Sequence, residues 1–271
     1  MKLALTATPS SARFAPIIVR DKVDKAFALA AELGYDGLEL HLRRPSDVDL
    51  SVVKALATDY GLEIPMLGTG MGVDDGLTFS DPDRDVRRRA VERIKEHIEL
   101  AVSLGSTVVL GSMRGSLGSD TQQQSRRRGF IVDCMAECCE AASRAGVGLL
   151  LEPINRYETN FINTVDEALE VLEQLGSPCM KLLVDTFHMN IEEAHIGRSV
   201  QRAGPLVGHV HLGDSNREAP GHGHLDLLGV LQSLQEIAYQ GYLSFEVLPL
   251  PNTRKAAEDA IQTARQLLSE L

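Results

Sequence analysis

The sequence predicts a (β/α)8 (TIM) barrel, an α/β fold in which one domain spans residues 1–271. Two observations support this prediction. Apolar, β-branched runs alternate with helix-like runs from one end of the chain to the other, and no linker interrupts them. The apolar runs also lack a polar face, as is typical of parallel strands that helices cover. Together they indicate repeated strand-plus-helix units that close into a barrel.

The first half of the chain contains four such units. Each predicted helix there is followed by a glycine, the residue that most easily ends a helix in the left-handed conformation. The predicted strands are residues 2–8, 37–43, 63–70 and 107–114. The predicted helices are residues 21–33, 49–60, 83–104 and 122–144, and their stops are Gly34, Gly61, Gly105 and Gly146.

The second half repeats the pattern. Its predicted strands are residues 148–155, 180–188, 207–215 and 242–249, with helices that begin near Thr164, Ile191, Leu225 and Thr253. An open doubly wound sheet is the alternative, but neither GxGxxG nor GxxxxGK[ST] follows the first strand. The glycine-rich GTGMG (68–72) is expected to be a tight loop at the barrel mouth that leaves space for a ligand.

Composition excludes several classes of protein. The net charge of −11 argues against a nucleic-acid partner, because the chain has no basic excess with which to displace counterions from phosphates. No apolar run approaches the length of a membrane span, and the N-terminus lacks the apolar segment of a signal peptide. We therefore expect a cytoplasmic protein without a membrane partner. The four cysteines form no CxxC pair. Cys134, Cys138 and Cys139 fall in a predicted helix and are expected to be buried thiols; the fourth is Cys179.

Four metal-type ligands lie at or near the ends of the last four predicted strands. They are Glu152, Asp185, His211 and Glu246, spaced by 33, 26 and 35 residues, about one strand-plus-helix unit each. The C-terminal ends of barrel strands converge on one face, so these side chains are expected to meet. A carboxylate at the end of an apolar strand is costly unless it is paired or binds a metal. Three carboxylates and one imidazole suit Mn²⁺, Mg²⁺ or another divalent ion.

Other polar residues near the strand ends are candidates for substrate contacts. His188, placed in the loop after the sixth strand, either contacts substrate or is a plain loop histidine. Arg217 either holds a hydroxyl-rich or anionic substrate or pairs with a neighbouring acid such as Asp214 or Glu218. Glu158 follows the fifth strand and is a candidate supporting group. His209 points to the same side of its strand as His211 and is expected to lie deeper, in the core or as a hydrogen-bond partner.

The segments EPINRYETNFINTVDEAL, DTFHMNIEE, HVHLGDSNREAPGHGHLD and SFEVLPLP resemble the sugar isomerase/epimerase superfamily, which is similar to xylose isomerase. The resemblance covers nearly the whole chain and is greatest to 5-keto-L-gluconate epimerases and D-tagatose 3-epimerases. It implies a divalent ion, most simply Mn²⁺ with Mg²⁺, Co²⁺ or Zn²⁺ as alternatives, bound by the four strand-end residues. It also implies that His188 and Arg217 contact substrate oxygens, and that the chain forms a dimer or tetramer.

The predicted activity is therefore that of an isomerase, an epimerase that inverts the carbon next to the ketone of a ketose or keto sugar acid. Glu152 and Glu246 are the expected acid and base, acting through an enediolate that the metal stabilises. The chain departs from free-ketose 3-epimerases by having no tryptophan; Met113 and Arg114 occupy the region of their bulky aromatic residue. Arg114, together with Arg43 and Arg44, is a candidate contact for a substrate carboxylate, with surface placement as the alternative. These arginines favour a keto sugar acid over a neutral ketose as the substrate.

Other activities remain open at this point. Hydroxypyruvate isomerase and other aldose–ketose isomerases, including those of sugar phosphates, need the same groups. An endonuclease IV-like nuclease is a remote alternative, because its additional metal ligands are missing from the third and fourth strands and the chain is acidic. A non-catalytic sugar-binding barrel is disfavoured by the intact set of four ligands.

Overall fold

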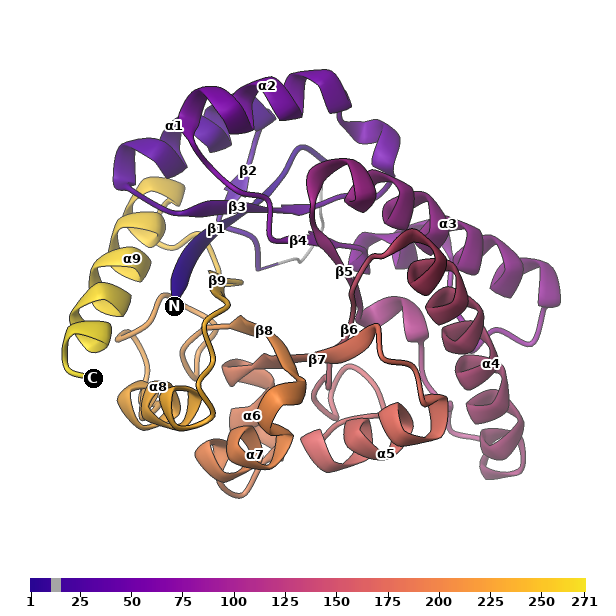
Figure 1. Ribbon diagram of the computed structural model, residues 1–271. Coiled ribbons are helices and arrows are strands. Elements are labelled where there is room, and N and C mark those ends of the chain that lie inside the picture. Colours follow the sequence, from indigo (N-terminus) through magenta and orange to yellow (C-terminus); the bar gives the residue numbers. More distant parts are fainter. Residues whose placement is uncertain (11–15) are drawn as a thin grey trace.

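The computed structural model describes residues 1–10 and 16–271, and its strands close into a barrel (Figure 1). In this part of the chain, eight parallel strands follow one another around the barrel, and the first pairs with the last. The predicted barrel is thus confirmed. Its strands are β1 (Lys2–Thr8), β3 (Gly37–His41), β4 (Met66–Gly68), β5 (Thr107–Leu110), β6 (Leu149–Leu151), β7 (Met180–Asp185), β8 (Val207–His211) and β9 (Tyr242–Phe245). A short additional strand, β2 (Val19–Arg20), pairs with the end of β1.

Helices surround the barrel on its outside (Figure 1). The first four end within one residue of the predicted positions, because the four stop glycines adopt positive φ angles between 65° and 80°. No helix in the described ranges is both long and apolar enough to cross a membrane. The outer helices are α1 (Val23–Leu33), α2 (Leu50–Tyr60), α3 (Arg84–Leu104), α4 (Thr121–Ala145), α5 (Val165–Leu175), α7 (Ile196–Ala203), α8 (Leu227–Glu236) and α9 (Thr253–Ser269).

One helix was not predicted. The predicted strand over residues 180–188 ends at Asp185, and α6 (Thr186–Glu192) begins directly after it. The reason is local: the Asp185 carboxylate accepts hydrogen bonds from the backbone N–H groups of Phe187 (2.8 Å) and His188 (3.3 Å), which makes it the N-cap of this helix. His188 therefore lies in the first turn of a helix and not in a loop.

The barrel has two apolar regions. The large one lies between strands and helices, and a small separate one, which we call the inner plug, consists of Met66, Val109, Leu150 and Leu183. Each of these four side chains is at most 5% exposed. Leu150 and Leu183 precede Glu152 and Asp185 by two residues, so they share the inward face of their strands. The inner plug therefore lies directly beneath the polar strand ends.

The cysteines are free thiols, as predicted, and those of α4 are buried. Burial raises the pKa of Cys134 and of Cys139 to about 11 and that of Cys138 well above its usual value. Because thiolate is the reactive form, we expect these three to react slowly with a disulfide reagent at pH 8. Titration of the native protein should show at most one rapid thiol, Cys179, whereas the denatured protein should show all four. Rapid reaction of a second thiol in the native protein would contradict this expectation.

Candidate metal centre and active site

Four side chains converge at the C-terminal ends of the strands. Glu152 follows β6, Asp185 and His211 end β7 and β8, and Glu246 follows β9. One ligand atom from each lies within 4.8 Å of all the others. The structure thus brings together the four residues that the strand spacing predicted would meet.

The geometry of this cluster suits a single divalent ion. The Nδ1 atom of His211 lies 3.5 Å from Asp185 Oδ2, 3.5 Å from Glu246 Oε2 and 3.7 Å from Glu152 Oε1. Ligand atoms that each lie about 2.1 Å from one ion, at angles of 90–110°, are separated by about 3.0–3.5 Å. His211 Nδ1 is also buried with no hydrogen-bond partner among the described residues, which is unusual for a polar atom. A metal ion would satisfy it.

Arg217 neutralises part of the negative charge. Its guanidinium donates to Asp185 Oδ2 at 2.7 Å and also to Glu246. Burial alone would raise the pKa of both carboxyls, but the positive charge of Arg217, with the neighbouring histidines, has the larger and opposite effect. The pKa of Asp185 is therefore lowered well below its usual range, and that of Glu246 is lowered to about 2. Both groups are therefore carboxylates at neutral pH. The sequence had suggested Asp214 or Glu218 as alternative partners of Arg217, and the structure shows different ones.

His188 approaches the cluster from α6. Its Nδ1 accepts a hydrogen bond from Asn155 Nδ2 at 2.8 Å, and its Nε2 lies 3.9 Å from Glu152 Oε1. Since an amide NH₂ only donates, Nδ1 is the acceptor and Nε2 carries the proton. Asn155 also donates to Glu158 Oε1 at 2.9 Å. His188 can therefore donate a hydrogen bond to an oxygen bound beside Glu152.

Part of this cluster lines a cavity of about 620 Å³ at the barrel mouth, large enough for a monosaccharide. Glu152, Glu158, His188, Arg217 and Glu246 all reach it. Its wall is otherwise mostly apolar, which excludes water from the polar groups. The sequence analysis did not single out these apolar side chains, because nothing in the sequence distinguishes them from core residues. They include Ile17, Met71, Val73, Ile154, Phe187 and Leu248.

Arg114 does not line this cavity, contrary to the expectation that it contacts substrate. It is 1% exposed, and its guanidinium donates to the backbone carbonyls of Gly111, Glu152, Phe161 and Ile162 at 2.7–3.2 Å. These hydrogen bonds connect the segment after β5 to both ends of the loop after β6, at Glu152 and at Phe161 and Ile162. Arg114 is therefore a buried structural residue. Its planar guanidinium group carries several N–H donors, which explains why an arginine can be accommodated there.

We expect the substitution Arg114→Met to lower the free energy of unfolding by about 3 kcal/mol, because several buried carbonyls would lose their donor. Urea denaturation would measure this loss. Arg144→Met, on an exposed part of α4, is the matched control and should change stability by no more than about 0.5 kcal/mol. A variant of unchanged stability whose only defect is weaker substrate binding would return Arg114 to the substrate site.

The other arginines proposed to hold a substrate carboxylate are also engaged with acids. Arg43 pairs with Asp74 at 3.0 Å, and Arg44 pairs with Asp75 at 3.2 Å. Of the described side chains that line the cavity, Arg217 is the only one with a permanent positive charge, and it already contacts two carboxylates. These observations weaken the expectation of an acidic substrate.

Sequence reasoning missed Glu39, in the middle of β3. Its carboxylate is completely buried and lies 2.6 Å from His41 Nε2, 2.8 Å from His209 Nε2 and 3.0 Å from His211 Nε2. The prediction that His209 lies deeper and acts as a hydrogen-bond partner is confirmed. A signal did exist: in GLELH (37–41) an acid lies two residues before a histidine within an apolar strand, so both side chains point inward.

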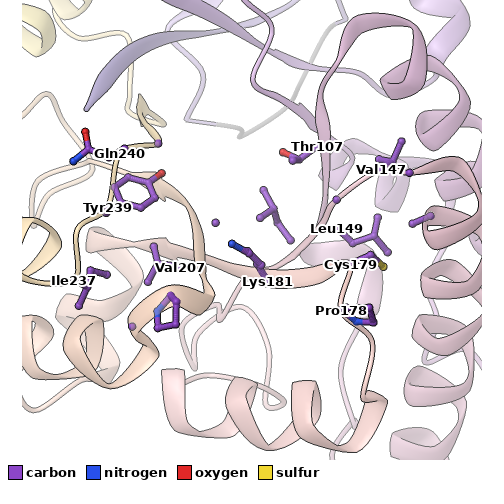
Figure 2. Close-up of a pocket in the computed structure, with 18 of the residues that line it drawn as sticks. Thr107, Val147, Leu149, Pro178, Cys179, Lys181, Val207, Ile237, Tyr239 and Gln240 are labelled. Carbon is purple, nitrogen blue, oxygen red and sulfur yellow. The ribbon is translucent and has the colours of Figure 1, made fainter.

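A second, larger cavity of about 820 Å³ lies at the opposite end of the barrel, where the strands begin (Figure 2). Its lining, as far as the chain is described, includes no aspartate, glutamate or histidine, and Lys181 is its only charged side chain. Figure 2 shows Lys181 near the middle of this lining, with Thr107 and Tyr239 on either side. It lacks the acid–base groups and the ligand set that the other cavity has, so we place the candidate active site at the C-terminal face.

Known proteins are similar to this chain in sequence and in fold. Residues 27–270 match the family model described as "Xylose isomerase-like TIM barrel". The chain is 32% identical over 228 residues to L-ribulose 3-epimerase of Mesorhizobium japonicum, which covers 84% of this chain and 76% of that protein. It is 31% identical to D-psicose 3-epimerase of Ruminiclostridium cellulolyticum, with 80% and 75% covered. It is 28% identical to 3-dehydro-D-guloside 4-epimerase of Escherichia coli, with 93% and 94% covered.

Solved structures agree. The structure of an L-ribulose 3-epimerase superposes with a TM-score of 0.84 at 28% identity and covers 99% of this chain and 95% of that one. D-allulose 3-epimerase from Methylomonas sp., solved in complex with D-allulose, superposes with a TM-score of 0.80 at 26% identity, covering 98% and 97%. Since the family model spans nearly the whole chain and a relative above 30% identity covers most of it, the chain belongs to the xylose isomerase-like TIM barrel family.

Proposed function

We propose that this protein is a metal-dependent ketose 3-epimerase. One observation carries the proposal: two glutamates, Glu152 and Glu246, reach the same cavity from β6 and β9, strands that lie across the barrel from each other (Figure 1). Between them lie His211 and Asp185, which complete a set of ligands that fits one divalent ion. Epimerisation needs a proton to leave one face of a carbon and another to arrive on the opposite face, which this arrangement permits. Relatives named as 3-epimerases of L-ribulose and D-psicose agree with it.

The proposed reaction follows from the positions of these groups. When bound, a divalent ion would supply Lewis-acid stabilisation of the negative charge that develops on the ketone oxygen as the neighbouring carbon loses its proton. Glu152, Asp185, His211 and Glu246 would hold that ion, most simply Mn²⁺. One glutamate takes the proton, and the other delivers one to the opposite face. His188 and Arg217 would hold substrate oxygens by donating hydrogen bonds, and Glu158 would accept one from a hydroxyl.

The cavity favours a neutral ketose over a keto sugar acid or a sugar phosphate. The acids Asp74, Glu152, Glu158 and Glu246 line it, and the guanidinium of Arg217 is already paired with carboxylates. An added carboxylate or phosphate would meet no unpaired cation among the described lining residues. We therefore propose a free ketose as substrate. The dimer or tetramer implied by the resemblance stays a prediction, which light scattering would test.

Proton exchange in D₂O tests the activity directly. Protein loaded with Mn²⁺ is incubated with ribulose, psicose, fructose, tagatose, 5-keto-gluconates, tagaturonate, fructuronate and hydroxypyruvate, and the products are followed by NMR. Deuterium at C3 of an inverted neutral ketose is the expected result. Turnover of the acids alone would reverse the proposed substrate class. Deuterium at C1 with an aldose product would mean an aldose–ketose isomerase. Bound metal without exchange in any compound would contradict the proposal.

A further inference from the structure

We propose that Glu39 is the positioning residue of the candidate metal centre. Its carboxylate accepts hydrogen bonds from the Nε2–H groups of His211 and His41. As a result, Nδ1 of His211 faces the other metal ligands, and Nδ1 of His41 faces the sugar cavity. The part that concerns the sugar rests on the proposed function. The part that concerns the metal ion does not.

The geometry around Glu39 is that of a hydrogen-bonded hub. Oε1 lies 2.6 Å from His41 Nε2 and 3.0 Å from His211 Nε2, and Oε2 lies 2.8 Å from His209 Nε2. A carboxylate only accepts hydrogen bonds, so each of these nitrogens must be the donor. The side chain is fully buried, and water cannot replace any of these partners. Losing the carboxylate would remove the partner of the buried Nε2–H groups of His41 and His211, which is costly, whereas His209 Nε2 would keep Ser244 Oγ at 2.9 Å.

This hub determines which nitrogen of His211 is available. With Nε2 donating to Glu39, Nδ1 is the atom left for coordination, and it is the atom that lies 3.5 Å from Asp185 and Glu246 without a hydrogen-bond partner among the described residues. Histidines that bind metals commonly donate their second ring N–H to a carboxylate, which fixes both the tautomer and the orientation of the ring. Glu39 meets that requirement from β3, on a different strand from any of the four ligands.

The same three residues, Glu39, His209 and His211, could instead bind an ion themselves. The distances argue against it. Two ligand atoms about 2.1 Å from one ion, at 90° or more, lie about 3.0 Å or more apart. The contact of Glu39 Oε2 with His209 is 2.8 Å, which is below that limit and in the range of hydrogen bonds. Glu39 Oε1, which lies 3.0 Å from His211, is already engaged with His41 at 2.6 Å.

His41 is held in the same way, at the edge of the cavity. Its ring lies against Gly68 of β4 so closely that a Cβ atom there would be 2.3 Å from His41 Nδ1. Its Nδ1 lies 4.0 Å from Glu246 Oε1, and the residue lines the cavity. With Nε2 donating to Glu39, this Nδ1 has a free lone pair. It can accept a hydrogen bond from a sugar hydroxyl beside Glu246.

Metal affinity tests the first part. The substitution Glu39→Gln removes the negative charge and one acceptor oxygen. Whichever way the amide turns, His211 Nε2 then faces either a neutral oxygen or an NH₂ group, so its charge-assisted hydrogen bond is lost. Calorimetric titration of chelator-treated protein with Mn²⁺ should give a dissociation constant about 10–100-fold higher than for the parent. Glu63→Gln is the matched control: this glutamate accepts from Lys2 and Tyr242 near the N-terminal ends of the strands, and its loss should leave affinity unchanged. Unchanged affinity in Glu39→Gln, or two Mn²⁺ ions per chain in the parent, would overturn the proposal.

A second measurement needs no variant and no substrate. In chelator-treated protein with ¹⁵N-labelled histidines, NMR should show a proton on Nε2 of His41, His209 and His211. An unprotonated Nε2 on His41 or His211 would overturn the proposal, even if the variant failed to fold. Because neither experiment measures turnover, the result stands whether or not the protein is an epimerase.

Steady-state kinetics test the role of His41. We expect His41→Leu to raise KM about tenfold, the effect of one lost hydrogen bond, while Mn²⁺ affinity stays unchanged. Glu39→Gln at saturating Mn²⁺ should show a similar rise in KM. An unchanged KM in both variants would remove His41 from the proposal. Absence of turnover on every ketose in the parent would refute the proposed function and leave the metal-affinity result to decide the role of Glu39.

Discussion

The substitutions Glu152→Gln and Glu246→Gln are each expected to abolish measurable epimerisation. Each removes a group that transfers a proton, and general acid–base catalysis contributes about 10²–10⁴-fold to such reactions. The amide keeps the shape of the side chain and one oxygen that can still face a metal ion, so folding and much of the metal binding should survive. The measurements are kcat on the best ketose, Mn²⁺ content and thermal unfolding.

These variants should also differ from each other in one half-reaction. The variant that lacks the base for a given epimer should not incorporate deuterium from the solvent into that epimer. The other variant should exchange the C3 proton of that epimer with solvent without completing the inversion. Glu63→Gln again serves as the control, because it makes the same chemical change far from the cavity. A near-parental rate in either active-site variant would show that the corresponding glutamate does not transfer a proton.

Removal of the divalent ion is expected to eliminate activity and to lower thermal stability together. Asp185, Glu152 and Glu246 converge on His211, and these acids are balanced in part by the guanidinium of Arg217. An ion present at 100 times its dissociation constant stabilises a protein by about 2.7 kcal/mol, which corresponds to about 5–10 °C in Tm for a chain of this size. Dialysis against a chelator, followed by Mn²⁺, should abolish and then restore both properties.

The variant His211→Ala separates this effect from general binding of Mn²⁺ to an acidic surface. Its Tm should no longer respond to Mn²⁺ at concentrations that stabilise the parent, because the ligand with the unpaired Nδ1 atom is gone. Full activity in protein from which metal has been removed to below detection would contradict the metal-dependent mechanism as a whole.

The sequence predicted the barrel and the meeting of four strand-end side chains for a physical reason. Parallel strands all end on the same face, so a position at the end of an apolar run specifies a place in space as well as in the chain. Glu152, Asp185, His211 and Glu246 could be found in this way. Their role as ligands remains a prediction that the chelation experiment tests.

What could not be predicted depends on side-chain direction and on local hydrogen bonds. Arg114 is the last residue of a predicted strand, as Glu152 lies near the end of another, but its long side chain turns toward backbone carbonyls that have no signature in the sequence. The helix that carries His188 depends on the capping hydrogen bonds of Asp185. The sequence analysis had already explained that residue as a metal ligand at a strand end, so its second role as an N-cap was not considered. Glu39 lies within β3, and one buried acid in a strand does not reveal which histidines of other strands surround it.

The inner plug separates the cavity at the barrel mouth from the hollow at the other end of the barrel. Leu150 and Leu183 fill the barrel directly below Glu152 and Asp185, so the hollow at the other end offers no route to them. Water displaced by an entering sugar must leave through the opening by which the sugar arrives. We expect a bound sugar to slow the exchange of protons between the two glutamates and bulk solvent. The amount of deuterium gained per product molecule would then report how often the glutamates exchange protons with solvent. The ratio of deuterium gained to molecules inverted would report how long each sugar stays bound.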